Sequence, residues 1–476
     1  MVVDMIKQRR IHMKKLRQCL LKSLIIVTLA GSTSFHNFTI SQLPFYASSD
    51  NYNDPMTTIN ELLGQEQYLF LKSDLPLVDS RATIIINADS GQVLYSEDGD
   101  YPLDILSITK AMTAYVILDK LHEPNTNINW DTRIVAKGGP LLVSYEYSFS
   151  NVSLYEGNSY TIRELFEAMM ITSANGATML LAEYFAGSEK AFVGLMMEKA
   201  AELKLSNTSF KTTTGLSKSD VIEFGYDDLE DGNNQMSCED VAFMTANLIN
   251  DYPEILEFTS MTKSVFAAGT TYPFEYWTTN ELLAGEYYEY EGVDGLKTGG
   301  DIPDYTSSIV LTAKQEDTRL IAVMLGARNS DARSVEAHKL LDFGFKNVYH
   351  ETFVDRSEQI FEDGVVNVKY SNTRKLPVKL EKPFILSSSY SDLDPEIIFI
   401  PTNTKYNSTH DAFVGPIKKG EVLGKLVVKY SDLYFLTTTD AIDYHVDVIA
   451  DADANNNFYL FNVFEWIGDW VYDLLY

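Results

Sequence analysis

The chain has 476 residues, enough for two or three domains that each bury a hydrophobic core. Its composition of 45% hydrophobic and 22% charged residues is typical of a globular protein and excludes a mainly disordered chain. The formal net charge of −29 argues against nucleic-acid binding through a basic face and indicates a soluble surface.

The first segment, residues 1–47, has the pattern of an export signal. Seven of the 38 basic residues lie in it, and an apolar run at 20–30 is followed by small and polar residues. Because this run is short and is interrupted by Lys22, a membrane span is not expected. Cleavage is expected near Ala30 or after Ala47, and an uncleaved anchor is the alternative.

Only two cysteines occur in the chain, Cys19 and Cys238. Cys19 precedes the apolar run instead of following it, which argues against a lipoprotein. Removal of the signal leaves Cys238 as the single thiol, so no internal disulfide is expected in the exported protein.

After a polar N-terminal segment at 48–79, a β-hairpin is expected, with strands at 82–87 and 92–95 around the turn sequence Ala88-Asp89-Ser90-Gly91. A helical pattern then runs from Ser107 toward residue 121.

Ser107 and Lys110 are three residues apart, so a helix beginning near Ser107 places both side chains on one face of its first turn. A serine hydroxyl becomes a good nucleophile when a neighbouring base takes its proton. Lysine can be that base if burial and a second cation lower its pKa, and Lys297 could supply the cation. The alternative is an ordinary helix start with Ser107 as the N-cap and Lys110 in solvent.

A long helical segment is expected at 161–186, where Thr161 and Glu164 have the spacing of a capping box. The segment contains Ser173 and Asn175, two residues apart, whose side chains could point together into a cleft. The alternative is that both side chains cap the helix that follows.

A polar, acidic region at 227–234 precedes a further helix at 237–249. Its clustered carboxylates suggest calcium, but their spacing does not match an EF-hand loop, so a solvated loop is expected. No metal site and no cofactor are predicted.

Two apolar runs at 305–312 and 320–326 are predicted strands, separated by a charged turn. The tripeptide Lys297-Thr298-Gly299 lies just before them and is expected on or beside an edge strand. Taken alone, this tripeptide is also typical of a turn.

Three short motifs thus occur in one order, and together they form the signature of class A β-lactamases and penicillin-binding proteins: Ser107-x-x-Lys110, Ser173-x-Asn175 and Lys297-Thr298-Gly299. Their surroundings resemble the serine-type D-alanyl-D-alanine carboxypeptidases, the low-molecular-weight penicillin-binding proteins. The matching stretches cover roughly residues 80–345 and are 89–95, 107–113, 170–175, 181–184, 214–216, 280–283 and 293–299. Residues 414–424 are similar to the C-terminal β domain of the same family.

The resemblance implies an α/β (α+β) transpeptidase-like catalytic domain at 80–350, with an antiparallel sheet flanked by helices. It also implies that Ser107 attacks the carbonyl between two D-alanines of a peptidoglycan stem peptide. Lys110 would take the serine proton, and Ser173 would help to relay it to the leaving amine. β-Lactams would acylate Ser107 as covalent inhibitors.

The resemblance further implies a substrate-binding set. Asn175 would bind the peptide chain, and Lys297, Thr298 and Gly299 would hold the terminal carboxylate. The backbone N–H groups of Ser107 and Gly300 would form the oxyanion hole.

Four positions, at three places in the chain, depart from the usual family pattern. The chain has Ile105-Leu106 where the family usually has proline and alanine, and Gly176 where an acid often follows the asparagine. Gly300 stands where the family commonly has histidine or tyrosine, which could loosen the oxyanion hole. These changes bear on rate and β-lactam affinity more than on reaction type.

Short apolar runs predict a small, sandwich-like all-β domain at 354–448, which could hold the catalytic domain away from the membrane or bind a partner. A polar linker at 449–457 follows. The last segment, 458–476, has an acidic stripe opposite an aromatic face and is expected to be an amphipathic helix that anchors the protein at the membrane surface. A helix packed on the β domain is the alternative.

The sequence therefore predicts a secreted, membrane-associated D-alanyl-D-alanine carboxypeptidase on the extracytoplasmic face. One alternative is a catalytically silent protein that binds D-alanine termini of the cell wall. A serine β-lactamase is disfavoured, because no Glu-x-x-Leu-Asn motif follows Asn175 to supply a deacylating carboxylate.

Overall fold

A computed structural model describes most of the chain between residues 75 and 455. The described ranges are 75–270, 272–301, 306–388, 396–428, 434–436 and 445–455. The predicted export signal at 1–47 and the predicted helix at 458–476 lie outside the described residues, as does nearly all of the segment at 48–79.

One sheet has six strands, and every neighbouring pair is antiparallel. In spatial order the strands are β10 (Val293–Asp301), β11 (Thr306–Gln315), β12 (Thr318–Ala327), β1 (Ala82–Asn87), β2 (Gln92–Glu97) and β21 (Tyr434–Phe435). The predicted hairpin at 82–95 and the two strands after Lys297 are confirmed. β10, which carries the Lys-Thr-Gly tripeptide, is an edge strand as predicted.

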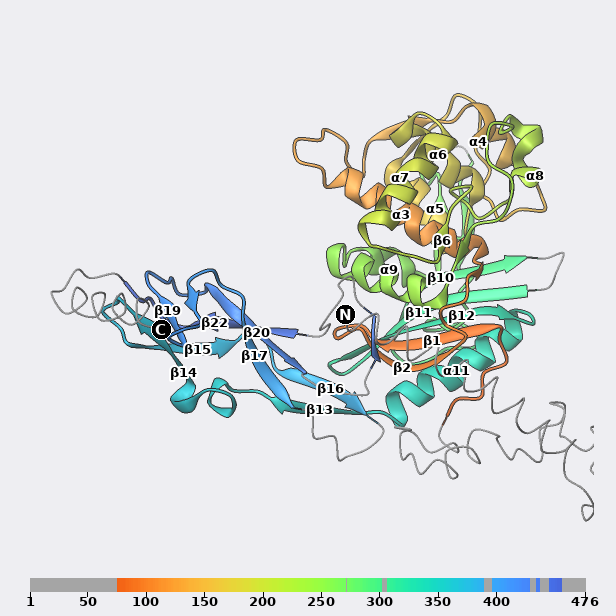
Figure 1. Cartoon of the computed structure of the whole chain (residues 1–476). Helices are drawn as coiled ribbons and strands as arrows, with labels where there is room; N and C mark the ends of the chain where they lie inside the picture. The colour runs from red at the N-terminus through yellow and green to blue at the C-terminus, as the bar shows by residue number, and fades with distance from the viewer. Residues whose placement is uncertain are drawn as a thin grey trace, which may run out of the picture. The chain divides into compact units, whose positions relative to one another are not determined.

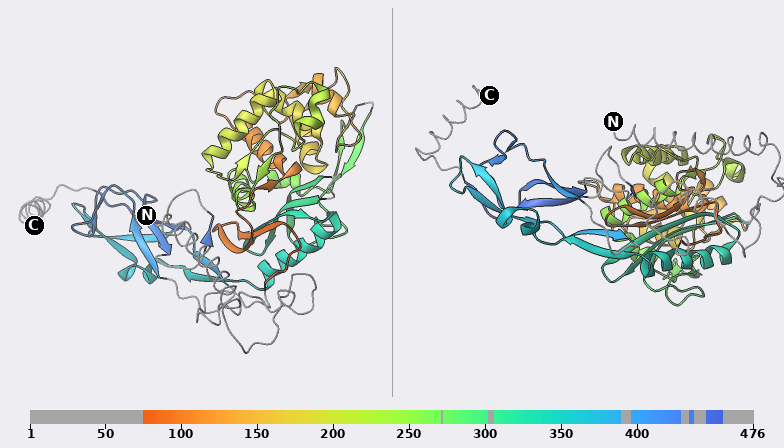
Figure 2. Two further views of the ribbon diagram at one scale, coloured as in Figure 1. Left: turned by 45° about the vertical axis from the view of Figure 1, so that its right-hand side comes forward. Right: turned by 60° about the horizontal axis from the view of Figure 1, so that its bottom comes forward.

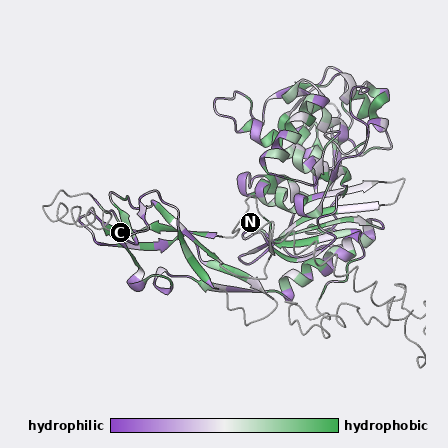
Figure 3. Ribbon diagram, in the orientation of Figure 1, coloured by the Kyte–Doolittle hydropathy of each residue, from purple (hydrophilic) through white to green (hydrophobic). Residues whose placement is uncertain are grey.

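Both faces of this sheet are covered, which explains why β1 is apolar along nearly its whole length. Successive side chains of a strand point to opposite faces, so Ile84 and Ile86 join one hydrophobic cluster while Ile85 joins another. Helix α9 (Cys238–Asp251) packs on the first face and α11 (Ser330–Lys346) on the second (Figures 1 and 2). Figure 3 shows mostly hydrophobic strands beside helix α11, in which hydrophilic and hydrophobic residues alternate.

A group of helices and short strands covers the α9 side of the sheet and contributes most of the first hydrophobic cluster. The remaining helices are α3 (Thr109–Leu121), α4 (Gly138–Val143), α5 (Ile162–Ile171), α6 (Asn175–Ala186), α7 (Glu189–Glu202), α8 (Lys218–Val221) and α10 (Ile255–Thr259). The short strands are β3 (Leu103–Asp104), β4 (Arg133–Val135), β5 (Ser159–Thr161), β6 (Thr208–Ser209), β7 (Gln235–Met236), β8 (Lys263–Phe266) and β9 (Phe274–Trp277).

The predicted helix at 161–186 is two helices, α5 and α6. The capping box is confirmed, because the Glu164 backbone N–H donates to Thr161 Oγ1 at 3.1 Å and the Thr161 N–H donates to Glu164 Oε2 at 2.8 Å. The break comes at Ser173, whose positive φ of 62° is incompatible with a continuing right-handed helix. Sequence periodicity misses this break because apolar residues continue on both sides of it.

The C-terminal region is β-rich, as predicted, and most of its strands form a sheet of seven. In spatial order these are β17 (Ile397–Pro401), β20 (Val422–Val428), β22 (His445–Ala450), β15 (Lys375–Leu380), β14 (Val365–Lys369), β19 (Ala412–Val414) and β18 (Tyr406–Asn407). A two-stranded ladder of β13 (Tyr349–Val354) and β16 (Phe384–Ser388) accompanies it. Residues from both sheets meet in one hydrophobic cluster, which is how this small region obtains its core.

One strand departs from the predicted division of the chain. The sequence predicts the run at 432–436 within the β domain, yet Tyr434 and Phe435 pair with β2 at the edge of the six-stranded sheet. The Leu436 N–H donates to the Gly91 carbonyl at 2.9 Å, and the Leu436 side chain joins the first hydrophobic cluster. Sequence order alone cannot reveal this return of the chain, since the strand itself resembles its β-domain neighbours.

Among the residues that the structure describes, no helix is both long enough and apolar enough to cross a membrane.

Candidate active site

The site lies where helix α3 begins, between the edge strand β10 and the helical group. Ser107 is in a single 3-10 turn, Leu106–Ile108, that leads directly into α3. The Lys110 amine lies 3.1 Å from Ser107 Oγ, so the two side chains are neighbours as their spacing predicts. The alternative of a solvated Lys110 is wrong, because this lysine is 0% exposed.

The backbone before Ser107 is strained and tightly enclosed. Leu106 has a positive φ of 52°, a conformation that costs a non-glycine residue about 1–3 kcal/mol. A Cβ at Gly215 would lie 2.0 Å from the Leu106 carbonyl oxygen, and a Cβ at Gly299 would lie 2.9 Å from that of Ile105. The two glycines therefore let neighbouring segments approach and hold the turn that presents Ser107.

Lys110 is the centre of a buried hydrogen-bond network. Its amine is 2.8 Å from Asn175 Oδ1 and 2.8 Å from the Thr214 carbonyl oxygen, in addition to Ser107 Oγ. Burial lowers the pKa of Lys110 well below its ordinary value, and the charge of Lys297 lowers it further. Both effects favour the neutral amine, which is the form of lysine that can accept a proton.

Asn175 is the first residue of α6, but its side chain does not cap that helix. Its Oδ1 accepts from Lys110, and its Nδ2 donates to the Ser150 carbonyl at 3.1 Å. The alternative of local capping is therefore wrong for Asn175. Beside it, a Cβ at Gly176 would lie 2.7 Å from the Pro140 carbonyl oxygen, which explains why no acidic side chain occupies this position.

Ser173 lies in the break between α5 and α6, in the strained conformation described above. It is 4% exposed, and its hydroxyl has no hydrogen-bond partner among the residues that the structure describes. A buried hydroxyl without a partner is unfavourable, so this group is poised to bind something that the protein alone does not supply.

Lys297 and Thr298 lie on β10 and are both nearly fully buried. Burial lowers the pKa of Lys297 to about 7, and the nearby Arg333 guanidinium contributes to the same effect. Thr298 Oγ1 is 2.6 Å from Thr279 Oγ1. The backbone carbonyl of Thr279 in turn accepts a hydrogen bond from the Arg333 guanidinium at 3.4 Å. Two cations and a hydroxyl near one another make a site suited to a carboxylate.

Gly300, in contrast to Gly299, has open space around it. Nothing lies within 4 Å of a Cβ built at Gly300. A side chain at this position would therefore meet no neighbour at its Cβ.

Sequence reasoning missed two buried charged residues near the site, Glu189 and Arg333. Glu189 is 2% exposed and accepts hydrogen bonds from the backbone and side chain of Thr213. Arg333 is 5% exposed. Both stand in helix first turns among other polar residues, where the expected position of a charge is in solvent, so only the fold reveals their burial.

The described residues contain no group of three or more histidine, cysteine, aspartate or glutamate side chains that could hold a metal ion. In the acidic region at 227–234, the buried polar residue is Asn234, an amide that is 1% exposed. Its Oδ1 accepts from the Lys211 N–H at 2.6 Å and its Nδ2 donates to Thr109 Oγ1 at 2.9 Å. Asn234 thus ties the segment before Thr214 to the start of α3.

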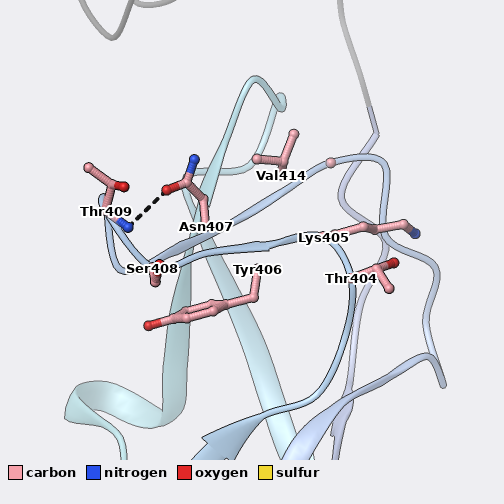
Figure 4. A pocket seen from close by; sticks show the side chains of 8 residues that line it. Thr404, Lys405, Tyr406, Asn407, Ser408, Thr409 and Val414 are labelled. Atoms are coloured by element: carbon pink, nitrogen blue, oxygen red, sulfur yellow. Dashed lines mark hydrogen bonds between the residues drawn. The ribbon is translucent and has the colours of Figure 1, made fainter. Parts of the chain in front are cut away.

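A polar concavity lies in the β domain, far along the chain from these motifs (Figure 4). Its volume is about 570 Å³, and it is lined by residues 404–409, Val414 and Gly415. The Lys405 amine donates to Glu421 Oε1 at 2.6 Å and to the Pro416 carbonyl at 2.7 Å. The one lysine among the lining residues is thus paired with its own neighbours.

Comparison with known proteins gives consistent matches. A family described as D-alanyl-D-alanine carboxypeptidase matches residues 71–329. The D-alanyl-D-alanine carboxypeptidase DacF of Bacillus subtilis is 29% identical over 356 residues, which are 74% of this chain and 82% of that protein. DacC of Escherichia coli, with the same description, is 30% identical over 368 residues, 74% of this chain and 80% of that protein.

Solved structures have the same fold. A peptidoglycan synthesis regulatory factor from Streptococcus pneumoniae superposes with a TM-score of 0.69 at 27% identity, covering 79% of this chain and 100% of that chain. Penicillin binding protein 5 from Haemophilus influenzae superposes with a TM-score of 0.59 at 22% identity, covering 80% and 99% of the two chains, and supports the fold alone. The predicted transpeptidase-like fold with a separate β-rich region is confirmed.

Proposed function

The chain belongs to the family of D-alanyl-D-alanine carboxypeptidases, and on that basis we propose how its own residues carry the reaction. The protein is a serine-type enzyme that removes the terminal D-alanine from peptidoglycan stem peptides. The residue roles below are inferred from the geometry of the site.

The observation that carries the proposal is the set of three contacts at the Lys110 amine. A neutral amine has two hydrogens and one lone pair. When Asn175 Oδ1 and the Thr214 carbonyl accept the two hydrogens, the lone pair faces Ser107 Oγ. Lys110 then takes the Ser107 proton while Oγ forms a bond to the carbonyl carbon of the scissile amide.

The terminal carboxylate of the substrate is held by Lys297 and Thr298. Binding a carboxylate offsets the burial of the Lys297 ammonium and restores its proton affinity. A carboxypeptidase acts on a peptide that ends in a free carboxylate, and the Lys297 and Thr298 side chains are placed to bind such a group. Gly299 has the supporting role of letting β10 approach the turn before Ser107.

Collapse of the tetrahedral intermediate breaks the carbon–nitrogen bond, and the leaving amine takes the proton that Lys110 received. We assign the relay of this proton to the Ser173 hydroxyl, which is buried and without a protein partner in the described structure. Asn175 positions the peptide chain, and the backbone N–H groups of Ser107 and Gly300 stabilise the oxyanion. Water then hydrolyses the acyl-enzyme and releases the shortened peptide.

β-Lactams are proposed to acylate Ser107 by the same attack, because their strained amide imitates the scissile bond. The acyl-enzyme would then be released slowly. This behaviour would also separate the protein from a β-lactamase, which hydrolyses the same adduct rapidly.

The proposed working place is the extracytoplasmic face of the plasma membrane, because peptidoglycan stem peptides are found there. The division predicted from the sequence is a signal at 1–47, a polar segment at 48–79, a catalytic domain at 80–350, a β domain at 354–448, a linker at 449–457 and a membrane-surface helix at 458–476. We propose two changes to it: residues 434–436 go with the catalytic sheet, and the β domain extends to residue 455, because Ala450 and Ala454 lie in its hydrophobic cluster. This division is supported by the residue pattern of the signal and by the separate hydrophobic cluster of the β domain. The final helix is proposed from its acidic stripe and aromatic face alone.

The test combines two measurements on the full chain and on the Ser107→Ala variant. Intact-mass spectrometry follows the adduct with benzylpenicillin, and a second assay follows D-alanine release from a stem pentapeptide. We expect a single penicilloyl adduct and D-alanine release, both lost in the variant. An adduct without D-alanine release would favour the silent wall-binding protein, and rapid loss of the adduct would favour a β-lactamase.

A further inference from the structure

The buried carboxylate of Glu189 is not used in the reaction described above. Glu189 is the first residue of α7 and accepts from the Thr213 backbone N–H at 2.7 Å. The Thr213 hydroxyl lies 2.8 and 2.9 Å from its two oxygens. No ion-pairing nitrogen is within 4 Å of it among the described residues. A carboxylate buried without a direct counter-ion is costly, which points to a function.

The segment that Glu189 holds is the same segment that holds Lys110. The Thr213 carbonyl accepts from Thr113 Oγ1 at 2.6 Å, and the Thr214 carbonyl accepts from the Lys110 amine at 2.8 Å. Thr113 and Lys110 both belong to α3, whereas Glu189 belongs to α7. Residues 213–214 are therefore clamped between the helix of the base and the helix of the carboxylate, and all of these side chains are buried.

The charges around this clamp act in opposite directions on Lys110. Burial and the Lys297 ammonium lower the pKa of Lys110, and the Glu189 carboxylate raises it. Burial raises the pKa of Glu189 to about 7, while its bonds from Thr213 lower it. The negative charge of Glu183, a carboxylate that accepts a hydrogen bond from the Tyr226 hydroxyl, also raises the pKa of Glu189.

We propose that Glu189 is a positioning residue for Lys110, which holds the 213–214 segment against the amine and stabilises the ammonium formed when Lys110 takes the Ser107 proton. The inference depends on Lys110 being the base, as proposed above. The transferred proton moves from Ser107 Oγ to Lys110 Nζ and later to the leaving amine, and Glu189 itself neither gains nor loses a proton in the step. Its role is similar to that of the third member of a catalytic triad, which orients the base and stabilises its charged form, but Glu189 acts through residues 213–214 and not by a direct bond to the base.

The test is the pH profile of acylation by benzylpenicillin, measured on the full chain as the second-order rate constant. The acidic limb of this profile reports the pKa of the base in the free enzyme. In Glu189→Gln, loss of the negative charge lowers the proton affinity of Lys110. We expect the acidic limb about one pH unit lower and the plateau rate about tenfold lower, because a weaker base drives proton transfer less well.

Asp240→Asn is the matched control. Asp240 is also in the first turn of a helix, is 9% exposed, and accepts from the Asn207 N–H and the Thr208 hydroxyl, each at 2.7 Å. The Asp240→Asn variant therefore loses a buried negative charge and similar hydrogen bonds at a place that does not contact the Lys110 segment. Its profile should match that of the wild type even if its melting temperature falls.

A second variant keeps the test decisive if Glu189→Gln does not fold. Thr213→Val removes the hydroxyl that favours the charged form of Glu189, so it should raise the pKa of Glu189 and move the acidic limb in the same direction. A limb that stays at the wild-type pH in a folded Glu189→Gln or Thr213→Val variant would overturn the inference. Absence of acylation in the wild type would instead overturn the role of Lys110 and Ser107.

Discussion

The active site and the pocket of the β domain are both rich in polar side chains, but the two regions differ in how deeply these side chains are buried and in what displaces their pKa values. In the site, Lys110 and Lys297 are buried and burial lowers the pKa of each. In the pocket, Tyr406 is the residue with a displaced pKa, and the main cause is a hydrogen bond to Asp411. Buried ionisable groups whose pKa is displaced by desolvation therefore indicate a functional site here better than a polar hollow does.

The largest effect that the comparison predicts is at Lys110. Lys110→Met should lower the acylation rate constant with benzylpenicillin by about 10³-fold or more, because proton abstraction by a positioned base contributes about 10²–10⁴-fold. Lys110→Arg should be similarly inactive, since a guanidinium stays charged and cannot accept the proton. Stopped-flow or quenched-mass measurements would show this, and an active arginine variant would contradict the role of base.

Lys297 is expected to affect binding of the substrate carboxylate more than proton transfer. Lys297→Met should raise KM for a D-alanyl-D-alanine peptide by about 100-fold, the effect of losing a charged hydrogen bond. Because the pKa of Lys297 is about 7, the wild-type KM should rise about tenfold per pH unit above that value as the ammonium is lost. The KM of the variant should not show this rise, and a parallel rise would assign the titration to another group.

A change at Ser173 is expected to lower activity without lowering stability. Ser173→Ala should lower kcat for D-alanine release by about tenfold to 100-fold through loss of the proton relay. Since the Ser173 hydroxyl has no partner in the described structure, its removal should leave the melting temperature unchanged or slightly higher. A clear fall in melting temperature with normal kcat would make Ser173 a structural residue.

The smallest effect is expected in the pocket of the β domain. Lys405→Met removes the contacts to Glu421 and Pro416 and should reduce the free energy of unfolding by about 1 kcal/mol. Acylation and D-alanine release should stay within about twofold of wild type, since ordinary surface changes rarely act at a distance. A larger loss of activity would show that the two regions are coupled.

The sequence predicts those parts of the molecule that depend on neighbours along the chain. The hairpin at 82–95, the capping box at Thr161 and the Ser107–Lys110 contact all depend on spacings of a few residues. The burial of Glu189 depends on Thr213, 24 residues away, and the pairing of Phe435 with Gln92 depends on a far longer return of the chain. Such contacts leave no local pattern, which explains why the motifs were found and the residue that supports them was not.

The middle position of β1 also has a consequence for how the protein is made. One edge of this strand can pair at once with β2, but its other edge pairs with β12. The Thr83 hydroxyl, for example, donates to the Val323 carbonyl, 240 residues away. Until those residues have emerged, the segment Ala-Thr-Ile-Ile-Ile-Asn presents an uncovered hydrophobic edge of the kind that aggregates. A nascent chain of this protein is therefore expected to depend on being kept apart from its copies until β12 has been synthesised.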